Sequence, residues 1–316
     1  MKTNSAKSVH MRKTLYCIAA LFALCSCEKG NEPNPGNTAG PQLKKVHRMD
    51  GTKQLGWVFN YNSDGRMIGQ TYFDGDVSTP ICAISYNGNE AIVIKTLTSP
   101  DVVEDTEIRI TLDNEGKALK KIQRTFMEFK GSIIPQRQYI YDTVNYEYDA
   151  AGLLKKTTGG RFDSTWFNPN DLEIWVDRST STANYTTSDG NFLNSVEVSI
   201  INGSHLMNGT TYHFDNKRDE ETWVYEYSKQ YPNKTDFANA ALLNELDIIP
   251  FVLNRNYKKM PDKIIWTLVS KDKNGNLLTS SDGGRNMTLE YDAKGYLSTV
   301  SSSYGQFSDQ FFLAYE

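Results

Sequence analysis

The sequence contains few of the residues that usually mark catalysis, metal binding or nucleic-acid binding. Its 316 residues include only four cysteines and four histidines. It has no HExxH, GxSxG, Walker A, GxGxxG or CxxC arrangement. Its formal net charge is −4, whereas nucleic-acid binding requires clustered Lys and Arg. We therefore expect no metal, no cofactor and no nucleic-acid partner, and we assign no catalytic residue.

Two of the histidines, His205 and His213, flank an Asn-Gly pair at 208–209. Asn-Gly is the strongest short-range signal for a two-residue β-hairpin. Such a hairpin pairs His205 with Tyr212, so that His213 lies on the opposite face of the sheet. We therefore predict that these two histidines do not share a metal ion.

Paired carboxylates remain an enzymatic option, because the acids of a glycosidase are brought together by the fold and leave no local motif. Asp163, Glu173, Glu197 and Glu226 are candidates, but the chain has 38 acidic residues. The sequence alone selects none of them.

Long apolar runs are also absent, except for one near the start of the chain. Arg12 and Lys13 precede an apolar stretch at 14–26, which is the order of charge and apolar length in a secretory signal peptide. The stretch is shorter than the roughly 20 residues of a membrane-spanning helix. The natural start is either Met1 or Met11.

The end of this stretch, Leu24-Cys25-Ser26-Cys27, resembles the bacterial lipobox. The resemblance implies that residues 1–26 are removed and that the Cys27 thiol carries a diacylglycerol. An ordinary secretory signal is the alternative. The lipobox predicts an outer-membrane lipoprotein, at the cell surface or on the periplasmic face, with its lipid as the membrane partner. Palmitate is then one of the expected acyl groups.

The rest of the chain divides into a linker and a folded domain. Residues 27–42 are dense in Pro, Gly and Asn, so they bury too little apolar surface to fold. We expect a lipid-anchored flexible linker with a reach of about 20 Å. The domain is predicted to span residues 43–316. Within it, Cys82 is expected to be a buried small apolar residue.

A repeated phrase organises that domain. The clearest copies are YEYDAAGLLK at 146–155, VSKDKNGNLL at 269–278 and LEYDAKGYLS at 289–298. Each combines an alternating strand, an Asp, two polar or small residues, a Gly, one further residue and an apolar residue that starts the next strand. An Asp side chain that accepts backbone N–H bonds, followed by a left-handed Gly, predicts a β-hairpin.

The phrase is similar to the YD repeat of Rhs-type proteins. The best matches begin at Tyr148-Asp149 and Tyr291-Asp292, although the spacing is irregular and we infer a similarity of hairpins rather than of toxin function. The segment 231–266, together with the lipobox and the hairpins, resembles uncharacterised Bacteroidetes-type lipoproteins, which are domains of unknown function. That resemblance implies a porin-like, meandering antiparallel sheet.

The fold class follows from alternation and turns. Polar and apolar residues alternate in most predicted strands, which is typical of antiparallel sheets with one wet face. We predict an all-β domain with a large curved antiparallel meander, open or partly closed like a barrel. One inserted α-helix is expected near 236–247, within an insert at 235–256.

The aromatic content of 12% suggests stacking surfaces on the sheet. Trp57, Trp166, Trp175 and Tyr185 are the candidate ligand-binding residues, although aromatic core packing and cross-strand ladders are the commoner explanation for any single Trp. We favour non-catalytic binding of a glycan, a peptide or an envelope partner. The alternatives are a carboxylate-dependent hydrolase acting on glycan or peptide and a structural subunit of an envelope complex.

Overall fold

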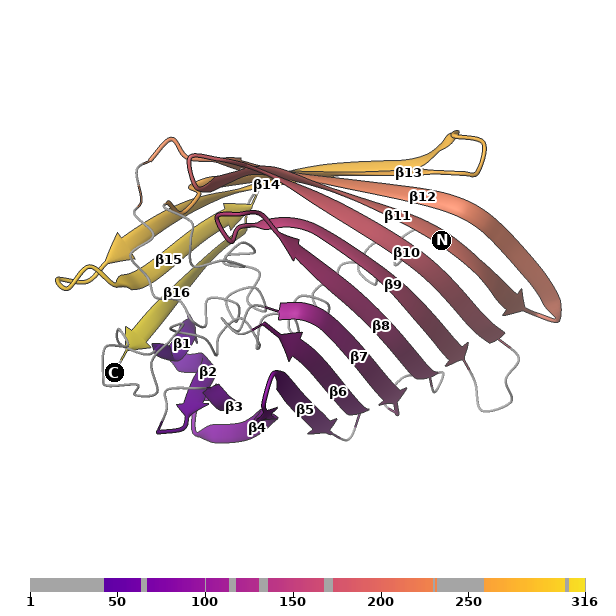
Figure 1. The fold of residues 1–316 in the computed structure, drawn as a ribbon. Helices are drawn as coiled ribbons and strands as arrows, with labels where there is room; N and C mark the ends of the chain where they lie inside the picture. Colours follow the sequence, from indigo (N-terminus) through magenta and orange to yellow (C-terminus); the bar gives the residue numbers. More distant parts are fainter. Residues whose placement is uncertain are drawn as a thin grey trace.

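The described part of the chain consists of β-strands joined by short turns. The computed structural model describes residues 43–63, 67–99, 101–113, 118–130, 136–167, 173–229, 231, 259–304 and 307–315. In these residues sixteen strands follow one another as an antiparallel meander (Figure 1). They are β1 (Leu43–Asp50), β2 (Lys53–Tyr61), β3 (Met67–Asp74), β4 (Val77–Asn87), β5 (Glu90–Thr98), β6 (Val102–Leu112), β7 (Ala118–Phe129), β8 (Gln136–Tyr148), β9 (Leu154–Phe167), β10 (Glu173–Ser188), β11 (Asn191–Met207), β12 (Thr210–Glu226), β13 (Lys263–Lys271), β14 (Leu277–Tyr291), β15 (Leu297–Tyr304) and β16 (Phe307–Tyr315). The predicted all-β antiparallel meander is confirmed.

The Asp-x-x-Gly turns have the geometry that the repeated phrase predicts. Between β8 and β9, Asp149 Oδ1 accepts hydrogen bonds from the backbone N–H groups of Ala151 and Leu153, at 2.9 and 2.8 Å. Asp272 and Asp292 accept the equivalent pairs in two later turns. The glycines of these turns share a positive φ, which is 76° at Gly152, 85° at Gly275 and 89° at Gly295. A residue with a side chain is strained in that region.

Tyrosines at strand ends fasten neighbouring strands together. Three hydroxyls donate to the carbonyl oxygen of the first residue of the preceding strand: Tyr61 to Leu43 at 2.7 Å, Tyr148 to Ala118 at 2.9 Å and Tyr315 to Leu297 at 2.8 Å. Burial raises the pKa of Tyr148 and of Tyr315, so both stay neutral donors. The tyrosine of the repeated phrase therefore has a structural role in at least the Tyr148 copy.

The sheet closes on itself. β1 pairs with β16, with Leu43 opposite Tyr315 and His47 opposite Phe312, and this pairing completes the ring. The sheet is thus a closed barrel rather than the open or partly closed one that we expected. The expected helix near 236–247 and its insert at 235–256 lie outside the described residues.

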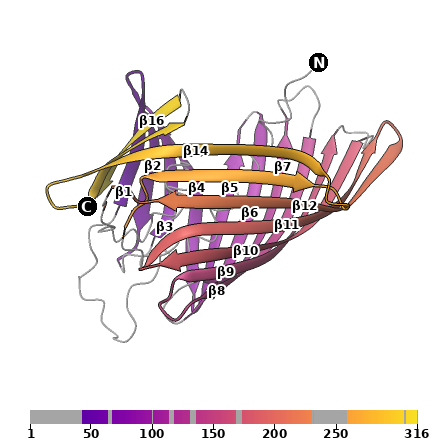
Figure 2. The same cartoon turned by 90° about the horizontal axis from the view of Figure 1, so that it is seen from above.

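Strand length divides the barrel into two walls. β8 to β12 and β14 contain between 13 and 17 residues, and we call them the tall wall. β15, β16, β1, β2 and β3 contain 8 or 9 residues. Figures 1 and 2 show the tall wall continuing well beyond the short strands.

A buried apolar cluster identifies the inner face of the barrel. It fills the end of the barrel at which β14 turns into β15, which we call the apolar end. Because its members come from strands all around the ring, their side chains can meet only inside. They are Leu43, Val46, Phe59, Ile84, Ala91, Val93, Ile108, Ile110, Ala118, Tyr146, Leu153, Leu154, Phe192, Tyr225, Met260, Ile264, Met287, Leu289, Leu297, Val300, Phe311 and Leu313.

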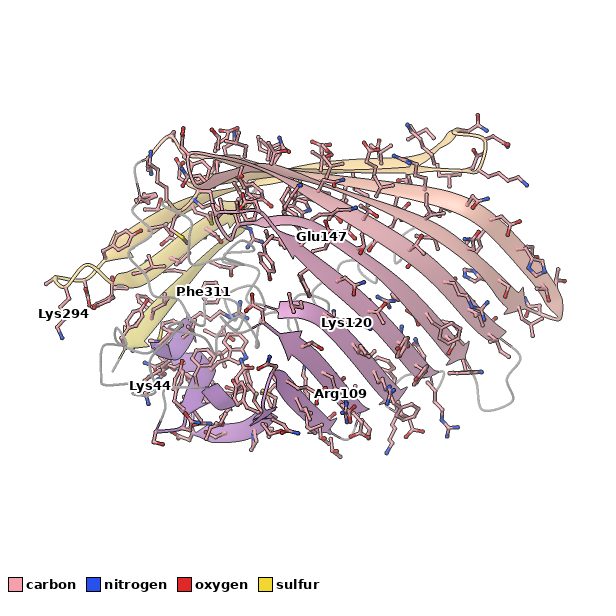
Figure 3. All side chains as sticks on the ribbon, viewed as in Figure 1. Lys44, Arg109, Lys120, Glu147, Lys294 and Phe311 are labelled. Atoms are coloured by element: carbon pink, nitrogen blue, oxygen red, sulfur yellow. The ribbon has the colours of Figure 1, made fainter. Side chains whose placement is uncertain are left out.

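Alternation along each strand then separates inward from outward residues. Among the residues labelled in Figure 3 are the exposed cations Arg109 on β6 and Lys120 on β7 and the buried core residue Phe311 on β16. Arg109 lies between inward Ile108 and Ile110, so it faces outward. Cys82 is half-buried against the core, which is less complete than the burial we expected.

Candidate binding surface

Beyond the apolar end, the inner face of β5 to β9 becomes polar. On β6 the inward residues change from Ile110 and Ile108 to Thr106 and Glu104, all of them buried. We call the inward polar residues of these strands the inner polar belt; on β7 it begins at Lys121, which pairs with Ile110, so the boundary between the apolar and polar interiors runs obliquely across the strands. The belt consists of Lys95, Glu104, Thr106, Lys121, Gln123, Thr125, Gln138, Asp142, Arg161, Asp163 and Thr165.

The charged groups of the belt lie in oppositely charged pairs. Lys121 Nζ donates to Asp142 Oδ2 at 2.7 Å, and the side chains are 1% and 10% exposed. Lys95 Nζ lies 3.6 Å from Glu104 Oε1. A buried charge without a partner costs several kcal/mol, so these pairs make a polar interior compatible with folding.

Asp163, one of the candidate acids, is the most heavily bonded carboxylate of the belt. It accepts hydrogen bonds from Gln138 Nε2 at 2.9 and 3.0 Å, from Arg161 and from Thr165. Its oxygens are therefore occupied by protein donors. This arrangement orients neighbouring strands and leaves little capacity for acid–base chemistry.

An aromatic group lies on the inner face of the tall wall, farther from the apolar end. Trp175 stacks on His205 with ring centroids 4.3 Å apart and an angle of 9°, and Phe167 lies 5.0 Å from Trp175. His205 Nε2 is 3.4 Å from Asp177 Oδ1. The cluster packs the interior.

The hairpin at 208–209 confirms the predicted histidine arrangement. His205 pairs with Tyr212 and His213 pairs with Ser204, so the two imidazoles lie on opposite faces. Across the described residues there is no group of three or more His, Cys, Asp or Glu side chains that could hold a metal ion.

The outer face of β7 to β9 carries a different set of aromatic residues. Phe126 and Tyr139 are directly opposite each other and are 38% and 36% exposed. Phe162 follows on β9, with its ring centroid 6.4 Å from that of Tyr139. Arg178 lies over the Phe162 ring at 5.2 Å. With Tyr141 and Trp166, which alternation also turns outward, these three aromatic residues form what we call the outer aromatic strip.

A shallow hollow of about 240 Å³ lies at the β5–β8 end of this strip. The residues around it are Ile94, Lys95, Thr96, Asp105, Thr106, Glu107, Arg124, Thr125, Phe126 and Tyr139. Three of them, Lys95, Thr106 and Thr125, belong to the inner polar belt and alternate inward, so the outward side chains are apolar, aromatic and charged residues of both signs from the other seven. Flat rings beside charged hydrogen-bonding groups can hold a ligand that has both an apolar face and polar edges.

The electrostatics of the hollow favour ionised groups. Arg109 Nε donates to Glu107 Oε1 at 2.8 Å. This bond lowers the pKa of Glu107, and the charges of Arg109 and Arg124 lower it further. A general acid requires a raised pKa. Glu107 is therefore suited to accept hydrogen bonds and not to donate a proton.

The four aromatic residues proposed from the sequence do not come together. Trp57 and Tyr185 face inward and pack against the apolar core, Trp57 edge-on to Tyr72 at 5.6 Å. Trp175 belongs to the inner aromatic group. Only Trp166 lies on the outer face, half-buried beside Arg137 and Ile174.

Sequence reasoning missed Phe126, Tyr139 and Phe162. On β7 both faces mix polar and apolar residues, since Lys121, Gln123 and Thr125 point inward while Phe126 points outward. The alternation of polar and apolar residues along β7 therefore does not show which of its side chains face solvent. The register of β7 against β8 was the missing information.

The proposed lipid-attachment residue, Cys27, lies outside the described residues. Where the structure describes the chain, no α-helix is long and apolar enough to span a membrane. No protein-family model and no curated protein matches the sequence.

Proposed function

We propose that this protein is a lipid-anchored envelope protein that binds a glycan without catalysis. The observation that carries the proposal is the hollow on the outer face, where exposed Phe126 and Tyr139 lie beside Arg124 and Glu107. In this proposal the anchor is the lipid on Cys27, and residues 28–42 connect it to Leu43, where β1 begins.

The physical basis is the complementarity of the hollow to a sugar ring. One face of a pyranose is a row of C–H groups, which packs on an aromatic ring, while the hydroxyls around its edge need donors and acceptors. Phe126 and Tyr139 supply the rings, Arg124 supplies donors and Glu107 supplies an acceptor. The volume is below the roughly 300–1,000 Å³ of enclosed ligand pockets, which suits one unit of a longer chain.

Binding is favoured over hydrolysis by the acids available. Asp105 and Glu107 both line the hollow, but the pKa of Glu107 is lowered by Arg109. Asp163 in the interior is occupied by protein donors. A hydrolase of the carboxylate type needs one acid with a raised pKa.

A glycan-binding screen of the full-length chain tests the proposal. We expect Phe126→Ala and Tyr139→Ala each to weaken binding by about tenfold. Tyr212→Ala is the matched control, because Tyr212 is 57% exposed but lies outside the hollow. If the protein instead binds a peptide, and both alanine variants weaken that binding, the binding surface is the one proposed but the ligand class is different. Release of sugar from the bound glycan would overturn the non-catalytic assignment.

A further inference from the structure

Two arginines on the outer face of the barrel differ from the others in having no carboxylate partner. Several arginines that the structure describes lie within ion-pair distance of an acid, namely Arg48, Arg109, Arg137, Arg161 and Arg218. Arg124 and Arg178 are exposed, and neither makes a hydrogen bond or an ion pair with another described residue. A guanidinium carries five N–H donors and a permanent positive charge. Both arginines can therefore offer charge and donors to a molecule outside the chain.

These two arginines lie at the ends of one row across the outer face. Arg124 on β7 is opposite Tyr141 on β8. Phe162 on β9 continues the row between Tyr141 and Arg178, which is on β10. Figure 1 shows the four strands side by side. Three strand spacings separate the two arginine backbones, which is about 14 Å. Two rings of the outer aromatic strip therefore lie between two positive charges.

Arg178 is held in place by an aromatic ring rather than by an acid. Its guanidinium lies over the Phe162 ring at 5.2 Å, and this contact leaves the N–H groups at the guanidinium edge able to donate. The other outward positions around it are Val176, Thr180 and Asn202. None of these is acidic, so an anion that approaches Arg178 meets no like charge from the adjacent outward positions.

Arg124 has an acidic neighbour, but that acid is bonded to another arginine. Glu107 is opposite Arg124 in the β6–β7 ladder, and its Oε1 accepts a hydrogen bond from Arg109 Nε at 2.8 Å. Asp105 and Glu107 line the hollow together with Arg124. With Arg109 included, these four formal charges cancel. The hollow thus suits an uncharged part of a ligand, while the Arg124 guanidinium keeps its donors for an acidic group beside it.

We propose that the glycan bound on this face is acidic, and that Arg124 and Arg178 bind carboxylate or sulfate groups of its sugar units. This inference rests on the proposed function, because it uses the same outer aromatic strip. A guanidinium matches two oxygens of such a group with two parallel N–H donors. The rings of Tyr141 and Phe162 pack against the apolar face of the sugar between them. The length of the row suits a chain of several sugars rather than a single one.

A general attraction of anions does not explain such binding. The net charge of the chain is −4, and a negative protein repels anions as a whole. Binding should therefore depend on the two guanidinium groups. It should also weaken as ionic strength rises, because salt screens exposed charges.

Calorimetry of the full-length chain with matched oligosaccharides tests the inference. One pair of probes is a galacturonic-acid oligosaccharide and its methyl ester, which has the same rings without the charge. Sulfated and unmodified dextran oligosaccharides are the second pair. We expect the charged member of at least one pair to bind about tenfold tighter or more, and that pair identifies the acidic group. Equal binding within both pairs, or no binding of any probe, would overturn the inference.

The glycan-binding screen separates this failure from failure of the proposed function. If the screen finds an uncharged glycan that depends on Phe126 and Tyr139, while no charged probe is preferred, the binding function stands and the acidic ligand does not. A screen that finds no glycan at all overturns both.

Single substitutions assign the preference to the row. Arg178→Met and Arg124→Met should each reduce the preference for the charged probe by about tenfold. Arg178→Lys should restore only part of it, because an ammonium group lacks the planar fork. Arg218→Met is the matched control, since Arg218 is exposed on the outer face but bonds to Glu220 at 3.1 Å. A preference unchanged in Arg178→Met, or lost equally in Arg218→Met, would contradict the inference; equal melting temperatures exclude misfolding.

Discussion

At the apolar end of the barrel the inward side chains are hydrocarbon, whereas one level farther along the same strands they are charged or polar. β6 shows both within four inward positions, Ile110, Ile108, Thr106 and Glu104. Apolar burial is non-directional and grows with the area removed from water. A buried ion pair depends on having both partners present in good geometry. One barrel thus combines two interiors that should respond differently to substitution.

The largest effect is expected in the inner polar belt. Lys121→Met leaves the Asp142 carboxylate without the cation that lies 2.7 Å away, and should lower the free energy of unfolding by about 3–5 kcal/mol. Denaturant unfolding measures this change.

The double variant Lys121→Met with Asp142→Leu sharpens the comparison. Because it removes both charges, most of the lost stability should return. If the double variant is less stable than Lys121→Met alone, the pair does not behave as a buried ion pair.

At the apolar end a second substitution should add to the first. Ile110→Ala removes a side chain that is fully buried and should cost about 2–5 kcal/mol. Val300→Ala, also fully buried on β15, should add its own cost. Recovery of stability in the double variant would contradict the distinction drawn between the two levels.

A smaller effect is expected at the turn that borders the apolar end. Gly152 has a φ of 76°, so Gly152→Val should destabilise the fold by about 1–3 kcal/mol through backbone strain. The neighbouring Ala151→Val is the control, because Ala151 is exposed and its φ is not positive. A similar loss in both variants would show that side-chain bulk and not φ is responsible.

The smallest effect concerns Asp272, in the turn between β13 and β14, away from both interiors. The Asn276 side chain and backbone N–H groups donate to it and lower its pKa. A lowered pKa contributes stability above the unfolded pKa, which is lost as the pH falls through the folded value. NMR titration should show an upward shift of this pKa in Asn276→Ala; an unchanged pKa would refute the role of that bond.

Much of the fold was predictable because its signals are local. An Asp side chain and a left-handed glycine determine a turn within five residues, as at Asp149 and Gly152. The Asn-Gly pair at 208–209 likewise predicted the register of His205. Closure was not predictable, because the pairing of β1 with β16 depends on the curvature accumulated over the whole sheet.

The candidate site was harder to predict for the same reason. Trp57 and Tyr185 stood out by residue type, yet they pack against the core. Phe126 and Tyr139 were overlooked, although they are exposed and opposite each other. Which face of a strand is exposed to solvent depends on how the rest of the sheet curves around it. A strand with polar and apolar residues on both faces does not reveal this from its own sequence.

The pairing of β1 with β16 also constrains how the barrel can form. Leu43 on β1 pairs with Tyr315 on β16. The contact that completes the ring therefore joins residues that are almost as far apart in the sequence as any two residues of the barrel. Such contacts slow folding, because the chain loses the entropy of loop closure before the paired strands contribute any stabilising free energy. A chain that emerges N-terminus first therefore holds β1 with an open edge until its last strand arrives. The β1–β16 pairing cannot form before β16 is available, and loss of a few C-terminal residues would affect β1 as directly as β16.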